Sequence, residues 1–179
     1  MRLIKMTMFA ALLAGHLAQA QTKGYPTVGD RCPDFTLSGV QGYGTATLSN
    51  KDFLGKKWMI LDFWSSTCRA CLTSFPKVNE LQQEFRNDIQ FVLVGNNGSE
   101  YNKGIEALYE RFSKKEKLAL THAFDSTLKD SFYFRTIPHL VIVDKEGVIY
   151  GMVYTSDLTS EKLRALVDGR KPTFNLKAD

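Results

Sequence analysis

The chain has 179 residues, of which 44% are hydrophobic and 12% aromatic, and its formal net charge at pH 7 is +4. This length and composition suit one domain with a single core and exclude a disordered chain. The nearly balanced charge, with no basic run interleaved with aromatic residues, argues against nucleic acid as a partner.

The first twenty residues differ in character from the rest of the chain. A short basic start, Met1 to Lys5, precedes a mostly apolar stretch from Met6 to Leu17, and Ala18-Gln19-Ala20 has the small-x-small form of a cleavage site. The apolar stretch is shorter than the roughly 18 to 20 residues that span a bilayer. Residues 1–20 are therefore predicted to be a secretory signal peptide, with a membrane anchor as the alternative. The mature protein is expected to be exported to the periplasm or another extracytoplasmic space, where disulfides persist.

The next part of the chain is expected to be a lead-in segment followed by a β-hairpin. Residues 21–34 are rich in Gly, Pro and Asp and form the predicted lead-in. The segments Phe35–Leu37 and Thr45–Leu48 flank the turn-like sequence SGVQGYG and predict two antiparallel strands. The domain itself is predicted to cover residues 35–170, and residues 171–179 are predicted to be a C-terminal tail.

The middle of the chain alternates between apolar strand patterns and helical stripes. Strands are predicted at residues 58–63, 89–94, 118–124, 140–143 and 148–154, and helices at residues 69–86, 103–117, 126–133 and 159–167. This alternation predicts an α/β domain whose sheet is mixed or parallel at its centre, with helices on both faces. In such sheets, ligands and chemistry gather beyond the carboxyl ends of the central strands.

Two of the three cysteines lie at that end of the first buried strand, in the sequence WSSTCRAC, where the next helix begins. The unpaired N–H groups of a helix start favour a thiolate at Cys68, and Arg69 adds positive charge beside it. The spacing of three residues lets Cys71 close a short disulfide with Cys68. We therefore predict Cys68 as the attacking thiol and Cys71 as the resolving thiol.

Other interpretations of the cysteines are less favoured. An inert staple between positions three residues apart would constrain the unfolded chain little. Half of a zinc site lacks a second CxxC, and the histidines are His16, His122 and His139. Cys32 is interpreted as a small buried residue, with an intermolecular or regulatory disulfide as the alternative.

Several stretches beyond the CxxC carry a family resemblance. They are LDFWSSTCRAC, with Asp62 six residues before the first cysteine, Pro76 five residues after the second, RTIPHLVIVD and VGDRCPDFTL. Through them the chain resembles the thioredoxin-fold superfamily and, more closely, the exported TlpA/ResA-like thiol-disulfide oxidoreductases, over about residues 28–168. The resemblance implies a thioredoxin-like α/β fold, a central mixed sheet flanked by helices, with an N-terminal hairpin. It also makes the helix near 103–117 a TlpA-type insertion.

The resemblance and the residue chemistry together suggest a role for Asp62. A carboxyl group in an apolar strand has a raised pKa, which would let it act as the base that accepts the proton of Cys71. The alternative is an acid at a strand edge that pairs with Lys56 or Lys57.

The resemblance also implies a docking site for the client protein. It makes Ile137-Pro138 a cis peptide bond that faces the cysteines, and the backbone of Ile137 would pair with an extended client segment. Trp64 and Arg69 complete the predicted substrate-binding set.

We expect no bound cofactor or metal, and as partners we expect the thiols or disulfides of client proteins and a membrane-linked electron donor. A monomer is expected. The family favours reduction of client disulfides, but the dipeptide Arg69-Ala70, in place of a dipeptide with proline, leaves the direction of electron flow open. The alternatives are a peroxiredoxin-like thiol peroxidase and a Cu(I)-binding chaperone that would use Cys68, Cys71 and His139.

Overall fold

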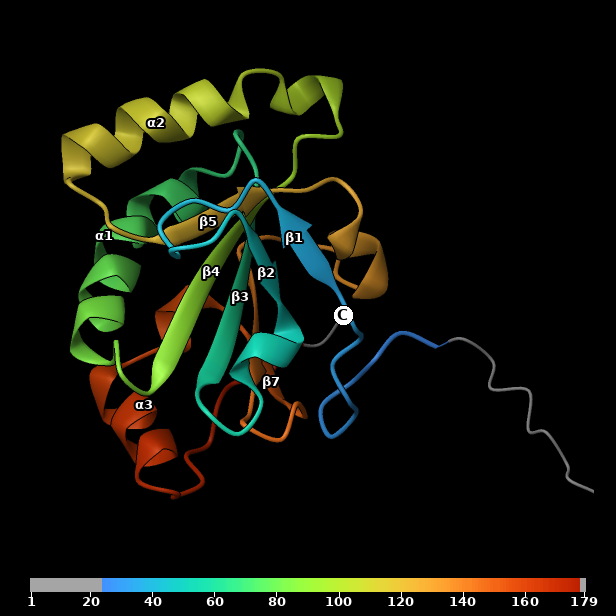
Figure 1. Cartoon of the computed structure of the whole chain (residues 1–179), viewed down its shortest axis with the longest axis vertical. Helices are drawn as coiled ribbons and strands as arrows, with labels where there is room; N and C mark the ends of the chain where they lie inside the picture. Colours follow the sequence, from blue (N-terminus) through green and yellow to red (C-terminus); the bar gives the residue numbers. More distant parts are fainter. Residues whose placement is uncertain (1–23, 178–179) are drawn as a thin grey trace, which may run out of the picture.

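The computed structural model describes residues 24–177 and contains two sheets (Figure 1). A two-stranded antiparallel sheet is formed by β1 (Thr36–Ser38) and β2 (Thr47–Ser49), as the hairpin prediction requires. The five-stranded sheet has the order β5-β4-β3-β6-β7. Its strands are β3 (Trp58–Trp64), β4 (Ile89–Gly95), β5 (Thr121–Phe124), β6 (His139–Val143) and β7 (Ile149–Val153). The predicted signal peptide lies outside the described residues.

The five-stranded sheet is mixed, and β3 lies at its centre. Strand β3 pairs in parallel with β4 and antiparallel with β6, β4 pairs in parallel with β5, and β6 pairs antiparallel with β7. A strand with neighbours on both sides and packing on both faces has a nearly continuous apolar sequence, as WMILDFW has. The predicted mixed α/β sheet is confirmed.

Three α-helices follow the predicted helical stripes closely. They are α1 (Arg69–Glu84), α2 (Ile105–Glu116) and α3 (Ser160–Val167). Buried residues on α1 recur at helical spacing, as Phe75, Val78 and Leu81 do, while Pro76 lies inside the same helix. Helix α3 begins after Thr159, whose hydroxyl accepts a hydrogen bond from the N–H of Lys162.

The predicted helix over residues 126–133 is a single 3-10 turn, η3 (Leu128–Ser131). A carboxylate oxygen of Asp125 accepts hydrogen bonds from the N–H groups of Thr127 at 2.7 Å and Leu128 at 2.5 Å. The carboxylate of Asp125 therefore satisfies two N–H groups at the start of this turn, whose N-cap residue is Thr127. The other short helical turns are η1 (Asn50–Phe53), η2 (Glu100–Asn102) and η4 (Thr155–Asp157).

The two faces of the five-stranded sheet are covered differently. The prediction of α-helices on both faces is wrong, because α1, α2 and α3 all lie on one face. The buried residues of α1, α2 and α3 pack in one cluster with Ile60 and Phe91. The second cluster, around Leu61 and Val92, is closed by the hairpin β1–β2, η1 and the η3 region. On this face the segment 126–133 contributes only the 3-10 turn η3, and the hairpin covers much of the remaining surface.

The segments that precede and follow the predicted domain both pack on β7. The N–H of Gly29 donates to the carbonyl of Ile149 at 2.9 Å. In the C-terminal segment the side chain of Phe174 is buried, and the N–H of Lys177 donates to the carbonyl of Met152 at 2.9 Å. The domain boundaries stay a prediction, but these contacts give both segments a place in the fold.

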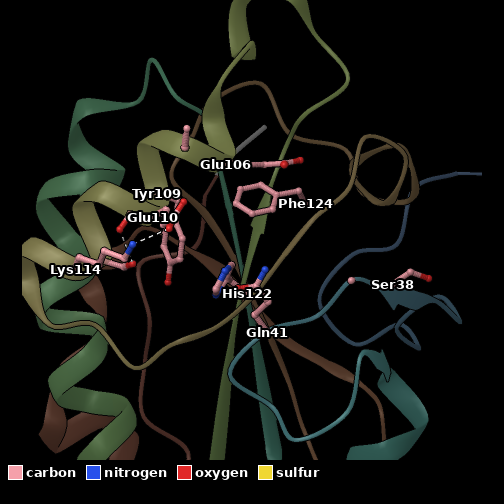
Figure 2. A pocket seen from close by; sticks show the side chains of 11 residues that line it. Ser38, Gln41, Glu106, Tyr109, Glu110, Lys114, His122 and Phe124 are labelled. Carbon is pink, nitrogen blue, oxygen red and sulfur yellow. Dashed lines mark hydrogen bonds and ion pairs between the residues drawn. The ribbon is translucent and has the colours of Figure 1, made fainter.

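Helix α2 encloses a cavity of about 860 Å³ with β5 and the loop after β1 (Figure 2). The side chains of Glu106, Tyr109 and Glu110 face it from α2, and His122 and Phe124 face it from β5. None of the predicted site residues lines this cavity. Within residues 24–177, no helix combines the length and the apolar character needed to cross a membrane.

Candidate active site

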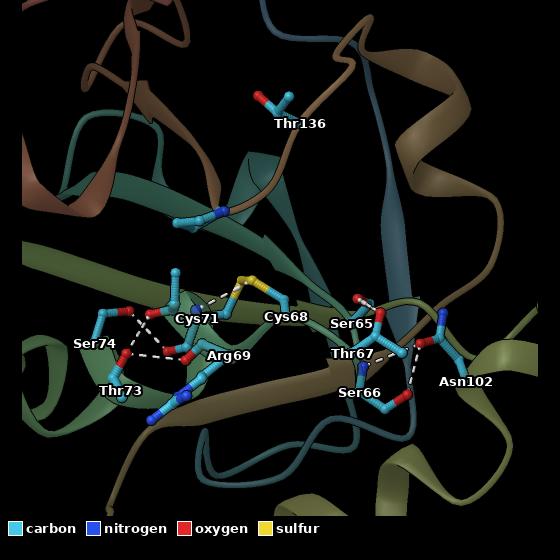
Figure 3. Close-up of a disulfide and its surroundings, with 12 residues drawn as sticks. Ser65, Ser66, Thr67, Cys68, Arg69, Cys71, Thr73, Ser74, Asn102 and Thr136 are labelled. Atoms are coloured by element: carbon cyan, nitrogen blue, oxygen red, sulfur yellow. Dashed lines mark hydrogen bonds between the residues drawn. A yellow bond between two sulfur atoms is a disulfide. The ribbon is translucent and has the colours of Figure 1, made fainter.

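Cys68 and Cys71 are joined by a disulfide at the start of α1, beyond the carboxyl end of β3 (Figure 3). Their Cα atoms are 5.3 Å apart. Cys68 is the N-cap of the helix, and its sulfur accepts a hydrogen bond from the backbone N–H of Cys71 at 3.1 Å. A helix start presents unpaired N–H groups, so negative charge on this sulfur is stabilised where it would develop.

The two sulfur-bearing residues differ in accessibility. Cys68 is 8% exposed and Cys71 is 0% exposed, and both belong to the buried cluster that contains Ile60 and Phe91. Because thiol–disulfide exchange needs direct access of the attacking sulfur, Cys68 is the better placed of the two residues to react with another protein. This is the asymmetry that an attacking and a resolving cysteine require.

Asp62 is fully buried in the middle of β3, between Leu93 of β4 and Leu140 of β6. Strand alternation places its side chain on the face that carries Ile60 and Trp64, which is the face covered by α1. Within residues 24–177 neither carboxyl oxygen has a hydrogen-bond partner. Burial raises the pKa of Asp62 to about 8.

The alternative that Asp62 lies at a strand edge and pairs with Lys56 or Lys57 is therefore wrong. Strand β3 is central, so its residue 62 is covered on both sides. The ammonium group of Lys57 instead donates to the backbone carbonyl of Arg86 at 2.7 Å. An unpaired carboxyl group in an apolar core favours its neutral form.

The Ile137-Pro138 peptide bond is cis and lies beside the CxxC. Pro138 and Ala70 line a common groove of about 340 Å³, together with Thr73, Tyr154 and other residues of the β7–η4 segment. On the other side of the same loop, Ile137 and Ser65 line a second pocket of about 200 Å³. The loop that carries Thr136 passes over the disulfide in Figure 3.

The two remaining members of the predicted substrate-binding set have different environments. Arg69 is exposed at the first turn of α1, next to Cys68. Trp64 is only 2% exposed, and its ring packs edge-on against Phe75 with a centroid distance of 5.2 Å. A client therefore has no access to the face of the Trp64 ring, and any contribution of this residue comes through packing under the site.

His139 lies on the opposite face of the sheet from Asp62. It pairs with Phe63 across β3 and β6, and its ring stacks on Phe134 with a centroid distance of 4.4 Å. In the described part of the chain, no group of three or more His, Cys, Asp and Glu side chains could hold a metal ion. The copper-binding alternative, which needs His139 beside both cysteines, is not favoured.

Two contacts in the site escaped the sequence analysis. Asn102, at the end of η2, accepts hydrogen bonds from the N–H and the hydroxyl of Ser66, at 3.0 and 2.9 Å, and so holds the loop before the CxxC (Figure 3). The ammonium group of Lys177 donates to the carbonyls of Thr136 and Pro138. No local pattern marks either residue, because each contact joins segments more than thirty residues apart in the sequence.

Comparison with known proteins places these features in a family. The AhpC/TSA family model matches residues 28–152. The chain is 26% identical over 145 residues to the thiol-disulfide oxidoreductase ResA of Geobacillus kaustophilus, a match that covers 81% of this chain and 79% of ResA. It is 25% identical over 141 residues to the thioredoxin-like protein YneN of Bacillus subtilis, covering 78% of each protein.

Solved structures agree on the fold. The thioredoxin domain of a thiol-disulfide oxidoreductase from Bacteroides vulgatus has a TM-score of 0.59 and 19% identity, and the match covers 80% of this chain and 96% of that domain. An uncharacterised conserved protein from Geobacillus kaustophilus has a TM-score of 0.70 and 16% identity, with 84% and 87% covered. With the thioredoxin-like fold, the paired cysteines and a family match over most of its length, the chain belongs to the AhpC/TSA family.

Proposed function

We propose that this protein is a thiol-disulfide oxidoreductase that reduces disulfides of exported client proteins through Cys68 and Cys71. The observation that carries the proposal is the asymmetry of the pair at the start of α1. The sulfur of Cys68, which accepts a hydrogen bond from a backbone N–H, is linked to Cys71, which is the more deeply buried of the two residues. Its relationship to ResA and YneN supports the same chemistry.

In the reducing direction the cycle starts from the dithiol. The Cys68 thiolate attacks one sulfur of the client disulfide, the client S–S bond breaks, and the leaving sulfur departs as a thiolate that takes up a proton. The product is a mixed disulfide between Cys68 and the client. The Cys71 thiolate then attacks the sulfur of Cys68 and releases the second client thiol. Two electrons have passed to the client, and the Cys68–Cys71 disulfide remains.

Asp62 fits the proton transfer that the second step needs. Cys71 must lose its proton before it can attack, and a base works best when its pKa is near the working pH. The pKa of Asp62, raised by burial to about 8, meets this condition. Asp62 also lies on the sheet face against which α1 and Cys71 pack.

Client docking is assigned to the groove beside the cis peptide bond. Pro138 and Ala70 both line this groove, and the backbone of Ile137 would pair with the client chain. Arg69 stands exposed beside Cys68 and would contact residues that flank the client disulfide. Trp64 supports this surface from beneath by packing.

The cellular setting follows from the sequence. Residues 1–20 would direct export and be removed, the lead-in 21–34 and the tail 171–179 would flank the domain 35–170, and the mature protein would work as a monomer without cofactor. Regeneration needs a donor of two electrons, for which we propose a membrane-linked protein dithiol: one of its thiols attacks Cys68, and the other resolves the mixed disulfide and leaves the donor as a disulfide.

The proposal is tested by reduction of insulin with dithiothreitol as the electron source. Wild type should accelerate it, Cys68→Ser should lose the acceleration, and Cys71→Ser should accumulate a mixed disulfide. A reduction potential near the value of about −270 mV of thioredoxin supports a reductant, and one near −120 mV an oxidant. Full activity in Cys68→Ser would refute the mechanism. Rapid consumption of hydrogen peroxide without insulin reduction would favour the peroxidase alternative.

A further inference from the structure

The C-terminal segment reaches the loop that carries the cis peptide bond. The ammonium group of Lys177 donates one hydrogen bond to the carbonyl of Thr136 at 2.6 Å and another to the carbonyl of Pro138 at 3.2 Å. These carbonyls belong to the residues on either side of Ile137. Hydrogen bonds from a charged donor are stronger than neutral ones, so one side chain restrains both ends of a three-residue segment.

Lys177 is itself held in place by the body of the protein. Its backbone N–H donates to the carbonyl of Met152 on β7 at 2.9 Å, and its ammonium group lies 4.3 Å from the centroid of the Tyr154 ring. Two residues earlier, Asn175 donates from its backbone and its side chain to the carboxylate of Asp157, at 2.7 and 2.9 Å. The ammonium group is therefore positioned by several anchors.

The restrained segment is the one that faces a client. Within the described residues, the backbone N–H and carbonyl of Ile137 make no hydrogen bond. The carbonyls of Thr136 and Pro138, on either side of it, both accept hydrogen bonds from Lys177. Pro138 and Tyr154, which Lys177 also contacts, both line the groove beside Ala70. A segment that is already ordered loses less conformational freedom when a peptide binds along it.

We propose that Lys177 is a positioning residue for client docking, which fixes the carbonyls of Thr136 and Pro138 so that the backbone of Ile137 is presented to an extended client segment. This inference rests on the proposed function. It gives the C-terminal segment a part in recognition, and it predicts that the segment affects protein substrates but not small disulfides, which react at Cys68 without docking.

The test compares Lys177→Met with wild type in two reactions. Methionine keeps the length and apolar stem of lysine but cannot donate a hydrogen bond. In insulin reduction the KM should rise about three- to tenfold while kcat stays within about twofold. This is the pattern expected when the substrate and the transition state lose the same amount of binding energy. The rate with the small disulfide 5,5′-dithiobis(2-nitrobenzoic acid) and the reduction potential should not change. Lys177→Arg should restore the KM for insulin.

Lys171→Met is the matched control, since Lys171 is an exposed lysine of the same segment. It should leave all parameters at wild-type values. A wild-type KM for insulin in a folded Lys177→Met protein would overturn the inference, and so would an equal loss with both substrates. If Lys177→Met does not fold, Lys177→Gln and Lys177→Arg provide the comparison: the inference requires a higher KM for the former. Inactive wild type would instead refute the proposed function.

Discussion

In the disulfide-bonded protein, the backbone N–H of Cys71 donates a hydrogen bond to the sulfur of Cys68, 3.1 Å away. The contact arises because Cys68 is the N-cap of α1, where a side chain ordinarily accepts from the second or third residue of the helix. Sulfur occupies the place of the usual capping oxygen. The contact that caps the helix thus directs an N–H at the sulfur on which a thiolate charge would develop.

Limited alkylation should distinguish the two cysteines of the reduced protein. We expect iodoacetamide at pH 7 to modify Cys68 at least about tenfold faster than Cys71, because only Cys68 is accessible and its anion is stabilised by the helix start. Peptide mass spectrometry after brief labelling measures the ratio. Equal labelling of both residues would contradict the assignment of attacking and resolving thiols.

Replacement of Asp62 by Asn should stabilise the protein in a pH-dependent way. The folded-state pKa of Asp62, about 8, lies above its value of about 4 in an unfolded chain, so folding favours the protonated form. The stability contributed by the neutral carboxyl group is complete below about pH 4 and is lost as the pH rises toward 8. At pH 7 Asp62→Asn should gain about 1 to 4 kcal/mol in free energy of unfolding, measured by denaturant titration.

The same variant should act more slowly. Without the carboxyl group the mixed disulfide formed at Cys68 should resolve about tenfold or more slowly near pH 7, because Cys71 loses its base. Stopped-flow measurement of product release gives this rate. A stability gain that is the same at pH 4 and pH 8 would contradict the buried, unpaired environment of Asp62, and a wild-type rate of resolution would contradict its role as the base.

Gly95 should not tolerate a methyl group. It pairs with Trp64 and with Phe124, and an added Cβ would lie 2.7 Å from a ring carbon of Phe124 and 3.1 Å from the indole nitrogen of Trp64. Gly95→Ala should lower the free energy of unfolding by about 1 to 3 kcal/mol, because the ring packing beneath the site is disturbed.

Gly151→Ala is the control for this prediction. Gly151 also lies in a strand of the sheet, but its added Cβ would meet no atom closer than 3.5 Å, an ordinary contact. Its stability should stay within about 1 kcal/mol of wild type in the same denaturant titration. Equal losses for Gly95→Ala and Gly151→Ala would show that crowding by the two rings is not the cause.

Cys32 should react slowly in the native protein. It is buried, and burial, followed by the charge of Asp34, raises the pKa of its thiol to about 12. With the Cys68–Cys71 disulfide closed, Cys32 is the remaining cysteine of the chain. Labelling with a maleimide at pH 7 should be at least about 100-fold slower than in guanidinium chloride. Fast native labelling would favour the alternative of an intermolecular or regulatory disulfide.

The amino-acid sequence was sufficient for the features that depend on neighbouring residues. The apolar run around Asp62 predicted a buried strand, the spacing of Phe75, Val78 and Leu81 predicted a helix, and their junction located the CxxC at the helix start. These predictions succeed because strand and helix periodicity and helix capping act over a few residues.

The tertiary structure decided what depends on distant segments. Whether Asp62 meets a lysine is settled by the position of β3 in the sheet, which no local pattern contains. Helices α1, α2 and α3 pack on one face of the sheet, and the parallel crossovers β3–α1–β4 and β4–α2–β5 put α1 and α2 on the same side. The contacts of Asn102 with Ser66 and of Lys177 with Thr136 and Pro138 join segments that meet only on folding. The sequence alone thus determined the place of the cysteine pair at a helix start, while the fold decided the environment of Asp62 and the contacts of the loop at 136–138, because packing brings together residues that are distant in the chain.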